Sequence, residues 1–229
     1  MKPLIERPKL GLRQVICAEA IAWLKEQSTE NSCSFVTSLP DISEVPSLNL
    51  NQWMEWFSNA AKLVLKACPD DGVVIFYQTD IKFEGQWIDK SYLCQRAAES
   101  TGHALLWHKI ICRKPPGGIT HGRPAYGHLL CFSKNIRMTD LLKSSSDVLP
   151  EPGKKLWARG MNIESCLIAC RFVLEHTQTR TIIDPFCGYG TVLAVANELG
   201  MDAIGIELST KRARKSLELN GVLARFGKD

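Results

Sequence analysis

The chain has 229 residues, of which 45% are hydrophobic and 23% charged, so it can bury a full core and is not expected to be disordered. No run of about 18 apolar residues is present, which argues against a membrane-spanning helix. The formal net charge of +4 permits a polyanionic partner but does not require one.

Short apolar runs alternate with helical patterns over residues 1–138, which is typical of an α/β fold with a mostly parallel sheet. Strands are predicted, in chain order, at residues 14–17, 34–39, 73–77, 104–112 and 126–133. Helices are predicted at residues 19–27, at 53–67 with Asn51 as the N-cap, and at 88–101. The last two strands flank a proline- and glycine-rich loop, so they are interpreted as a hairpin with a long connection.

Residues 139–156 divide the chain into two parts. Three consecutive serines, two prolines and a glycine predict a surface linker there. The part after it, residues 157–229, is predicted to contain helices and strands in alternation, at residues 163–175, 181–184, 191–199, 202–207 and 211–225. The short connections predict a βαβ unit, and residues 1–229 are interpreted as a single domain.

The strongest functional signal lies where the strand at residues 181–184 meets the next helix. Asp184 ends the strand, and Gly188 and Gly190 let the turn approach a ligand closely. The turn is neither a phosphate-binding P-loop nor a complete dinucleotide fingerprint. Glu207 ends the following strand, where a carboxylate can accept both hydroxyls of a ribose. Together these residues predict a nucleoside ligand with a cationic amino-acid part and no pyrophosphate.

The sequence Asp-Pro-Phe-Cys-Gly-Tyr-Gly-Thr at residues 184–191, followed by Ile-Gly-Ile-Glu-Leu at 204–208, resembles the S-adenosylmethionine site of nucleic-acid methyltransferases. Its position near the C-terminus resembles the permuted order of DNA amino-methyltransferases. The resemblance implies an enzyme with a Rossmann-like fold, a mostly parallel seven-stranded sheet and one antiparallel strand. The cofactor-binding residues that it implies are Asp184, Pro185, Phe186, Cys187, Gly188, Gly190, Thr191, Glu207, Glu19 and Asn162.

The catalytic loop departs from this family. Amino-methyltransferases carry Asp, Asn or Ser, then Pro-Pro, then an aromatic residue that stacks on a flipped base. Here the loop reads Ser38, Leu39, Pro40 and Asp41, so a carboxylate replaces the aromatic ring. Ser38, Pro40 and Asp41 are the catalytic candidates. Asp41 is interpreted either as a base for a hydroxyl or ring nitrogen, or as a turn residue without contact to substrate.

The acceptor is predicted to be a nucleic acid, and four residues are candidates for binding it. Tyr77 ends a strand beside the expected site, and Lys114, His121 and Arg123 lie in the loop at residues 114–124. Without a separate recognition domain, RNA is favoured over DNA, with tRNA as the preferred case. The alternatives are a DNA N6-adenine or N4-cytosine methyltransferase and a non-catalytic partner of another methyltransferase. A protein partner or homodimer is left open.

Nine cysteines are scattered through the chain without a Cys-x-x-Cys pair, so no metal site is predicted. They are interpreted as free, mostly buried thiols, which fits the cytoplasm or an organelle matrix. The first ten residues mix charges with prolines and are not interpreted as a signal peptide. Trp53 and Trp56, at helical spacing, are interpreted as packing residues rather than as base-stacking platforms.

Overall fold

Eight strands form the main sheet of this computed structural model, which describes residues 10–27, 32–139 and 145–226. The expectation about a signal peptide therefore falls almost wholly outside the described residues. The strands are β1 (Arg13–Ile16), β2 (Cys33–Thr37), β3 (Val74–Gln78), β6 (Ala104–Cys112), β7 (Tyr126–Ser133), β8 (Val148–Leu149), β9 (Thr181–Asp184) and β10 (Asp202–Ile206). Their order across the sheet is β1-β10-β9-β2-β3-β7-β6-β8. Two further strands, β4 (Ile81–Phe83) and β5 (Gln86–Ile88), form a separate antiparallel hairpin.

The predicted sheet is confirmed apart from one additional strand. β7 runs antiparallel to both of its neighbours, β3 and β6, and every other pair in the sheet is parallel. The eighth strand, β8, lies in the segment expected to be a surface linker and forms the edge of the sheet, where Val148 pairs opposite Ile110 of β6. β8 has only two residues and neither is fully buried, so its hydrophobic pattern is too weak to be recognised in the sequence.

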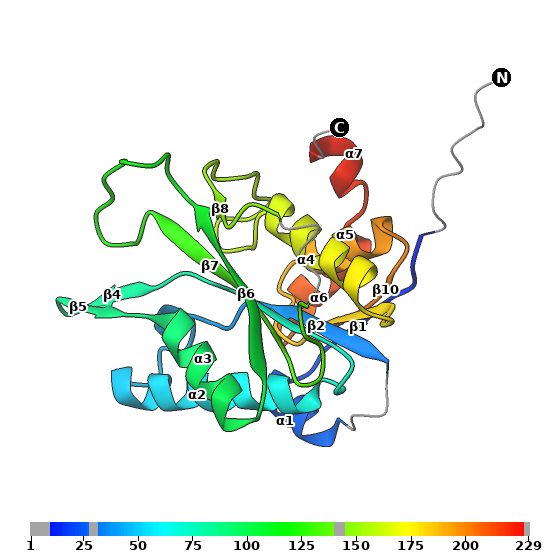
Figure 1. Cartoon of the computed structure of the whole chain (residues 1–229), viewed down its shortest axis with the longest axis horizontal. Coiled ribbons are helices and arrows are strands. Elements are labelled where there is room, and N and C mark those ends of the chain that lie inside the picture. The colour runs from blue at the N-terminus through cyan, green and yellow to red at the C-terminus, as the bar shows by residue number, and fades with distance from the viewer. Residues whose placement is uncertain (1–9, 28–31, 140–144, 227–229) are drawn as a thin grey trace.

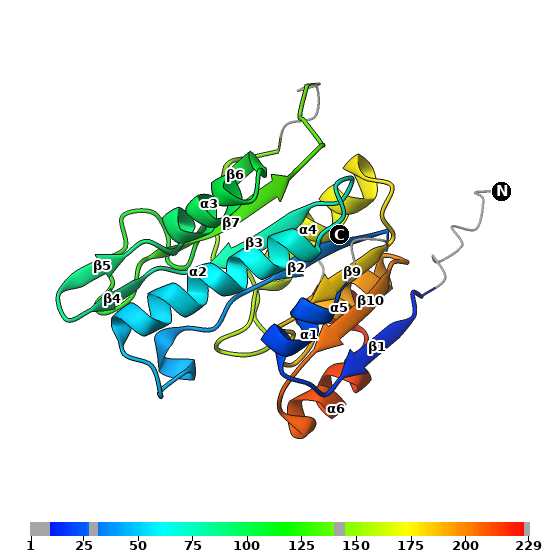
Figure 2. The same cartoon turned by 90° about the horizontal axis from the view of Figure 1, so that it is seen from below.

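Helices cover both faces of the sheet, as Figures 1 and 2 show. Below it in Figure 1 lie α1 (Ala20–Glu26), α2 (Leu50–Ala67) and α3 (Lys90–Ser100), and above it lie α4 (Ile163–His176), α5 (Thr191–Glu198) and α7 (Val222–Phe226). A further helix, α6 (Thr210–Glu218), packs beside β1. Adjacent strand residues face opposite layers: Ile182 packs on the α4 and α5 side, and Ile183 on the α2 side. All residues of β2 and β3 are buried, which is typical of central strands covered on both faces.

Two predicted helix boundaries are wrong. α2 begins at Leu50 because Asn49, not Asn51, is the N-cap: the backbone N–H of Gln52 donates to the side chain of Asn49 at 3.0 Å, and the Gln52 side chain accepts from Asn49 N–H at 3.0 Å. The helix expected at residues 211–225 is interrupted before Gly221, which has a φ of +67°. The helix α7 then restarts with backbone N–H groups that donate to Glu198.

The predicted state of the cysteines agrees with the structure. All nine are free, and Cys17 alone is exposed. In the part of the chain that the structure describes, no helix is both long and apolar enough to cross a membrane.

Candidate active site

A cavity of about 980 Å³ opens at the carboxyl ends of the central parallel strands, the usual ligand position in open α/β sheets. Five of the predicted cofactor residues line it: Glu19, Pro185, Phe186, Gly188 and Glu207. Its volume lies within the range of about 300–1,000 Å³ that is usual for small-molecule sites. The loop between β9 and α5, where the sequence predicts a ligand, therefore lines a cavity of suitable size.

Glycine is required for a different structural reason at each of three positions in and near this loop. Gly188 has a φ of +55°, faces the cavity, and has nothing within 4 Å of the position that a Cβ would take. At Gly190, with a φ of +80°, a Cβ would lie 2.2 Å from the Oγ of Ser216 on α6. A Cβ at Gly205 would lie 2.4 Å from a methyl group of Leu193, so this glycine lets the helix after the loop pack onto β10. Sequence reasoning missed Gly205.

Asp184 supports the loop from inside. It is 4% exposed, and its Oδ1 accepts from the Thr37 hydroxyl at 2.6 Å and from the backbone N–H of Phe186 at 3.1 Å. Burial raises the pKa of Asp184 to about 7, although these two hydrogen bonds oppose the shift. The resemblance suggested that Asp184 lies near the methionine amino group, but here it is not among the residues that line the cavity.

Four other predicted cofactor residues also lie behind the cavity wall. Asn162 is the N-cap of α4, because its Oδ1 accepts from the backbone N–H of Ser165 at 2.7 Å. Cys187 is buried with its Sγ 3.7 Å from the Ser216 hydroxyl, Thr191 begins α5, and Gly190 precedes it. These residues hold the loop and its flanking helices in place, and their predicted contacts with a cofactor remain predictions.

Two of the three carboxylates that line the cavity, Glu207 and Glu19, have local partners. Glu207 Oε1 accepts from Ser209 N–H at 2.7 Å and from the Arg212 guanidinium through Nε at 2.9 Å and Nη2 at 2.8 Å. All three contacts go to Oε1, so Oε2 remains available to a ligand hydroxyl as far as the described residues go. Glu19 caps α1, with its oxygens accepting from Ile21 and Ala22 N–H groups. Arg212 itself also lines the cavity.

Aromatic side chains from distant segments form part of the cavity wall. Trp56 of α2 lies edge-on to Phe186, with ring centroids 6.2 Å apart, while Trp157 stacks on Tyr189 at 4.0 Å. Trp53 is fully buried, and Trp56 packs against the core while also lining the cavity. No local pattern pairs Trp157 with Tyr189, because 31 residues separate them in the sequence.

The predicted catalytic loop forms another side of the same cavity. Ser38, Leu39 and Pro40 follow β2 and line it. Asp41 comes next, at the start of a short 3-10 helix, η1 (Ile42–Glu44). The turn is held by Glu44, whose Oε2 accepts from Asp41 N–H at 3.1 Å and whose N–H donates to the Asp41 carbonyl at 2.8 Å. The Asp41 side chain is thus free to face other partners.

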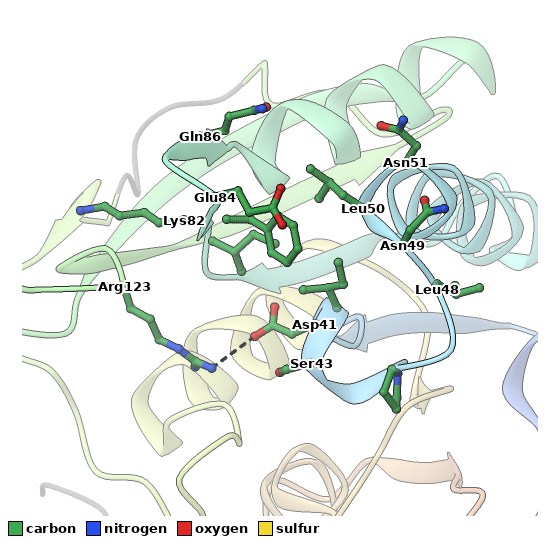
Figure 3. Close-up of a pocket in the computed structure, with 15 residues that line it drawn as sticks. Asp41, Ser43, Leu48, Asn49, Leu50, Asn51, Lys82, Glu84, Gln86 and Arg123 are labelled. Atoms are coloured by element: carbon green, nitrogen blue, oxygen red, sulfur yellow. Dashed lines mark ion pairs between the residues drawn. The ribbon is translucent and has the colours of Figure 1, made fainter.

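These partners are cations. Asp41 Oδ1 forms an ion pair with the ammonium of Lys90, which is buried at the first position of α3. Arg123 Nη2 lies 3.9 Å from Asp41 Oδ2, as Figure 3 shows. The backbone N–H of Lys90 donates to Asp80 at 2.9 Å, which fixes the start of the helix. Sequence reasoning missed Lys90; a lysine in the first helical turn, where acidic residues are favoured, was the available signal.

Two further hollows adjoin this ion pair. A groove of about 800 Å³ runs between η1, the start of α2 and the β4–β5 hairpin, and Figure 3 shows its lining. A small polar pocket of about 50 Å³ lies between this groove and the large cavity. Tyr77 and Arg123, predicted to bind substrate, line the small pocket, whereas Lys114 and His121 line none of the three hollows and remain exposed.

Comparisons with known proteins agree with this arrangement. Residues 168–218 match a sequence model of a DNA methylase family, N6_N4_Mtase. A putative DNA modification methylase from Thermus thermophilus, complexed with S-adenosyl-L-methionine, is similar with a TM-score of 0.67 and 16% identity, covering 90% of this chain and 93% of the other. The PvuII cytosine-N4-specific DNA methyltransferase has a TM-score of 0.68 and 17% identity, covering 93% and 88%. No curated protein matches the chain significantly.

These similarities confirm the predicted fold: the chain has the α/β architecture of methyltransferases, with the cofactor strands near its C-terminus. The matched family segment spans α4 to α6 and contains the predicted cofactor loop. Family segment and fold both agree with the prediction of a methyltransferase that uses S-adenosylmethionine. Neither identifies the polymer on which this chain acts.

Proposed function

We propose that the chain is an S-adenosylmethionine-dependent methyltransferase that acts on nucleic acid. One observation carries this proposal: Ser38, Leu39 and Pro40 line the cofactor cavity, and the next residue, Asp41, opens into the groove. A ligand in the cavity and an acceptor in the groove would therefore meet at one short loop. Bringing two reactants together in this way supplies much of the catalysis in a direct transfer.

The residues of the large cavity fit S-adenosylmethionine. Glu207 offers Oε2 to ribose hydroxyls, Gly188 allows close approach of the backbone, and Phe186 with Trp56 provides an apolar wall. The cavity size also suits a nucleoside with an amino-acid chain. When bound, S-adenosylmethionine supplies an activated methyl group on a sulfonium.

Asp41 and Lys90 are the groups proposed to orient the acceptor. The Asp41 carboxylate accepts a hydrogen bond from the acceptor N–H or O–H, and the buried ammonium of Lys90 holds the carboxylate in place. If the acceptor loses its proton during transfer, the Asp41 carboxylate is proposed to receive it. Both roles are consistent with a carboxylate at the position where amino-methyltransferases carry an aromatic residue.

Two polymers are candidates. DNA is supported by the matched family and by the names of the similar structures, and it outweighs the initial preference for tRNA. The size of the chain does not favour RNA over DNA, because it covers 93% of one DNA methylase and 88% of another. RNA remains the second candidate because Asp41 stands where base-stacking DNA enzymes carry an aromatic ring.

Binding and transfer measurements test the proposal. Calorimetry with S-adenosylmethionine should show binding, and tritiated methyl groups should appear in total DNA or total RNA, whichever contains the acceptor. Absence of cofactor binding contradicts the proposal. Tight cofactor binding without transfer to either polymer favours the non-catalytic partner. Label in RNA alone would identify RNA as the substrate. Mass spectrometry of the nucleosides would then identify the methylated atom.

A further inference from the structure

The small pocket beside the catalytic loop lies on the path between the groove and the cofactor cavity. It shares Ser38 and Leu39 with the cavity, and Asp41 and Arg123 with the groove. A substrate that reaches the loop from the groove must therefore contact this pocket. Its lining comes from four distant segments, around residues 38–44, 77–90, 113–123 and 155–159.

Positive charge dominates the pocket. Five cationic side chains line it: Lys90, Arg113, Arg123, Lys155 and Arg159. The acidic residues in the lining are Asp41 and Glu44, so the pocket has a formal excess of three positive charges. Such an excess in a partly enclosed site is unfavourable unless an anion compensates it.

Three of the five cations already form ion pairs with the two acidic residues. Lys90 and Arg123 pair with Asp41, and Arg159 Nη1 lies 3.6 Å from Glu44 Oε1. Among the described residues, the remaining two have no ion pair with a carboxylate.

These two cations, Arg113 and Lys155, face the pocket, and each contacts an uncharged group there. Arg113 donates to the carbonyl of Pro124 at 3.1 Å, and the Lys155 ammonium lies 5.7 Å from the Tyr77 ring centroid. Desolvation, and then the neighbouring Arg113 and Arg123, lower the pKa of Lys155. An anion between Arg113 and Lys155 would relieve this repulsion.

We propose that this pocket binds a backbone phosphate of the target nucleotide, an inference that rests on the proposed action on nucleic acid. A guanidinium matches the geometry of phosphate oxygens, and the Lys155 ammonium adds a point charge. A phosphate held by Arg113 and Lys155 positions the attached nucleotide against Asp41 without reading its base. The pocket thus sets the register of the substrate.

The test is the salt dependence of binding to single-stranded DNA and RNA 12-mers of mixed sequence. For single strands, the slope of log affinity against log salt changes by about 0.7 for each phosphate contact. The double variant Arg113→Met/Lys155→Met should therefore lose about 0.7 from the magnitude of the slope, with at least a roughly fivefold weaker affinity near 0.1 M salt. The charge-matched control Lys25→Met/Lys66→Met, on the exposed faces of α1 and α2, should retain the wild-type slope.

Several outcomes overturn the proposal. An unchanged slope means that the pocket holds no nucleic-acid phosphate, and a loss near about 1.4 means two separate contacts rather than one pocket. The exchange variant Arg113→Lys/Lys155→Arg guards against misfolding and should retain the slope. Inorganic phosphate is the second probe: if it binds the wild type but not the double variant while the 12-mer slopes agree, the pocket serves a free anion and the proposal fails.

Cofactor binding separates this inference from the proposed function. Neither Arg113 nor Lys155 lines the cofactor cavity, so the double variant should bind S-adenosylmethionine like the wild type. If the wild type itself binds no cofactor, the proposed function fails, whereas the salt slopes still decide whether the pocket takes a phosphate.

Discussion

The two halves of the site differ in how the chain builds them. The cofactor half uses the loop after β9 and the end of β10, which lie within 24 consecutive residues from 184 to 207. The acceptor half combines Asp41, Lys90, Arg123 and Lys155 from four segments. The first is a local backbone structure held by glycines and a buried carboxylate. The second is an electrostatic arrangement that exists only when distant segments meet, so substitutions should affect the two halves differently.

The largest expected effect lies in the acceptor half, at Asp41. Asn keeps the shape of the side chain but removes the charge that pairs with Lys90 and that is proposed to accept a hydrogen bond from the acceptor. The variant Asp41→Asn should lower the methyl-transfer rate about 100-fold or more, the usual range for losing a general acid–base group. Cofactor affinity should be unchanged, because Asp41 does not line the large cavity. Transfer of tritiated methyl groups and calorimetry measure the two quantities. A parallel loss of cofactor affinity would contradict the separation of the halves.

In the cofactor half, the next largest effect concerns pH. The pKa of Asp184 is about 7 in the folded protein because of burial, against about 3.9 for an unfolded chain. The folded state therefore binds the proton more tightly. The free energy of unfolding should fall as pH rises from about 4 to 7 and level off above that.

Asp184→Asn tests this sign. The amide oxygen can still accept from Thr37 and Phe186, but the side chain no longer ionises. At pH 8 the variant should be more stable than the wild type, by about 4 kcal/mol at most, and the difference should shrink as pH falls to about 4. Denaturant unfolding between pH 4 and 8 measures the difference. Parallel pH profiles would show that Asp184 does not carry a raised pKa.

Gly190 tests the geometry of the loop. Gly190→Ala adds a Cβ at a left-handed φ and against Ser216, so it should cost about 2–3 kcal/mol of unfolding free energy through strain and overpacking. Gly102→Ala is the matched control, because Gly102 has a φ of +75° but nothing within 4 Å of its Cβ position. Only the strain, about 1 kcal/mol, should appear there. Equal losses in thermal unfolding would remove the argument that α6 packs against this glycine.

The smallest expected effect concerns Glu207. Glu207→Gln removes the charge that faces both Arg212 and the proposed ribose, and should weaken S-adenosylmethionine binding about tenfold, equivalent to about 1.4 kcal/mol. Transfer at saturating cofactor should change little, because Glu207 does not line either acceptor hollow. The exposed Glu175→Gln on α4 is the control in calorimetry. Unchanged affinity would place the ribose elsewhere in the cavity.

Local sequence patterns were enough to predict most strands and helices and the loop at residues 184–191. The strands at 104–112, 126–133 and 181–184 agree with the structure at both ends, because buried strands and their turn residues leave a strong local pattern. The loop at residues 184–191 is likewise a local feature, since Gly188 and Gly190 are required by their own backbone angles. Residue types at fixed spacing were sufficient there.

Packing between segments determines which side chains meet. In the folded chain Lys90 lies against Asp41, Arg212 against Glu207, and Trp157 against Tyr189. Asp184 is buried and accepts from Thr37 and Phe186, while its predicted contact with a cofactor stays a prediction. Side-chain contacts across a sheet depend on how the layers pack, and no local periodicity encodes that packing. The cation partners of Asp41 therefore became visible only in the folded chain, whereas the loop at residues 184–191 could be predicted along the sequence.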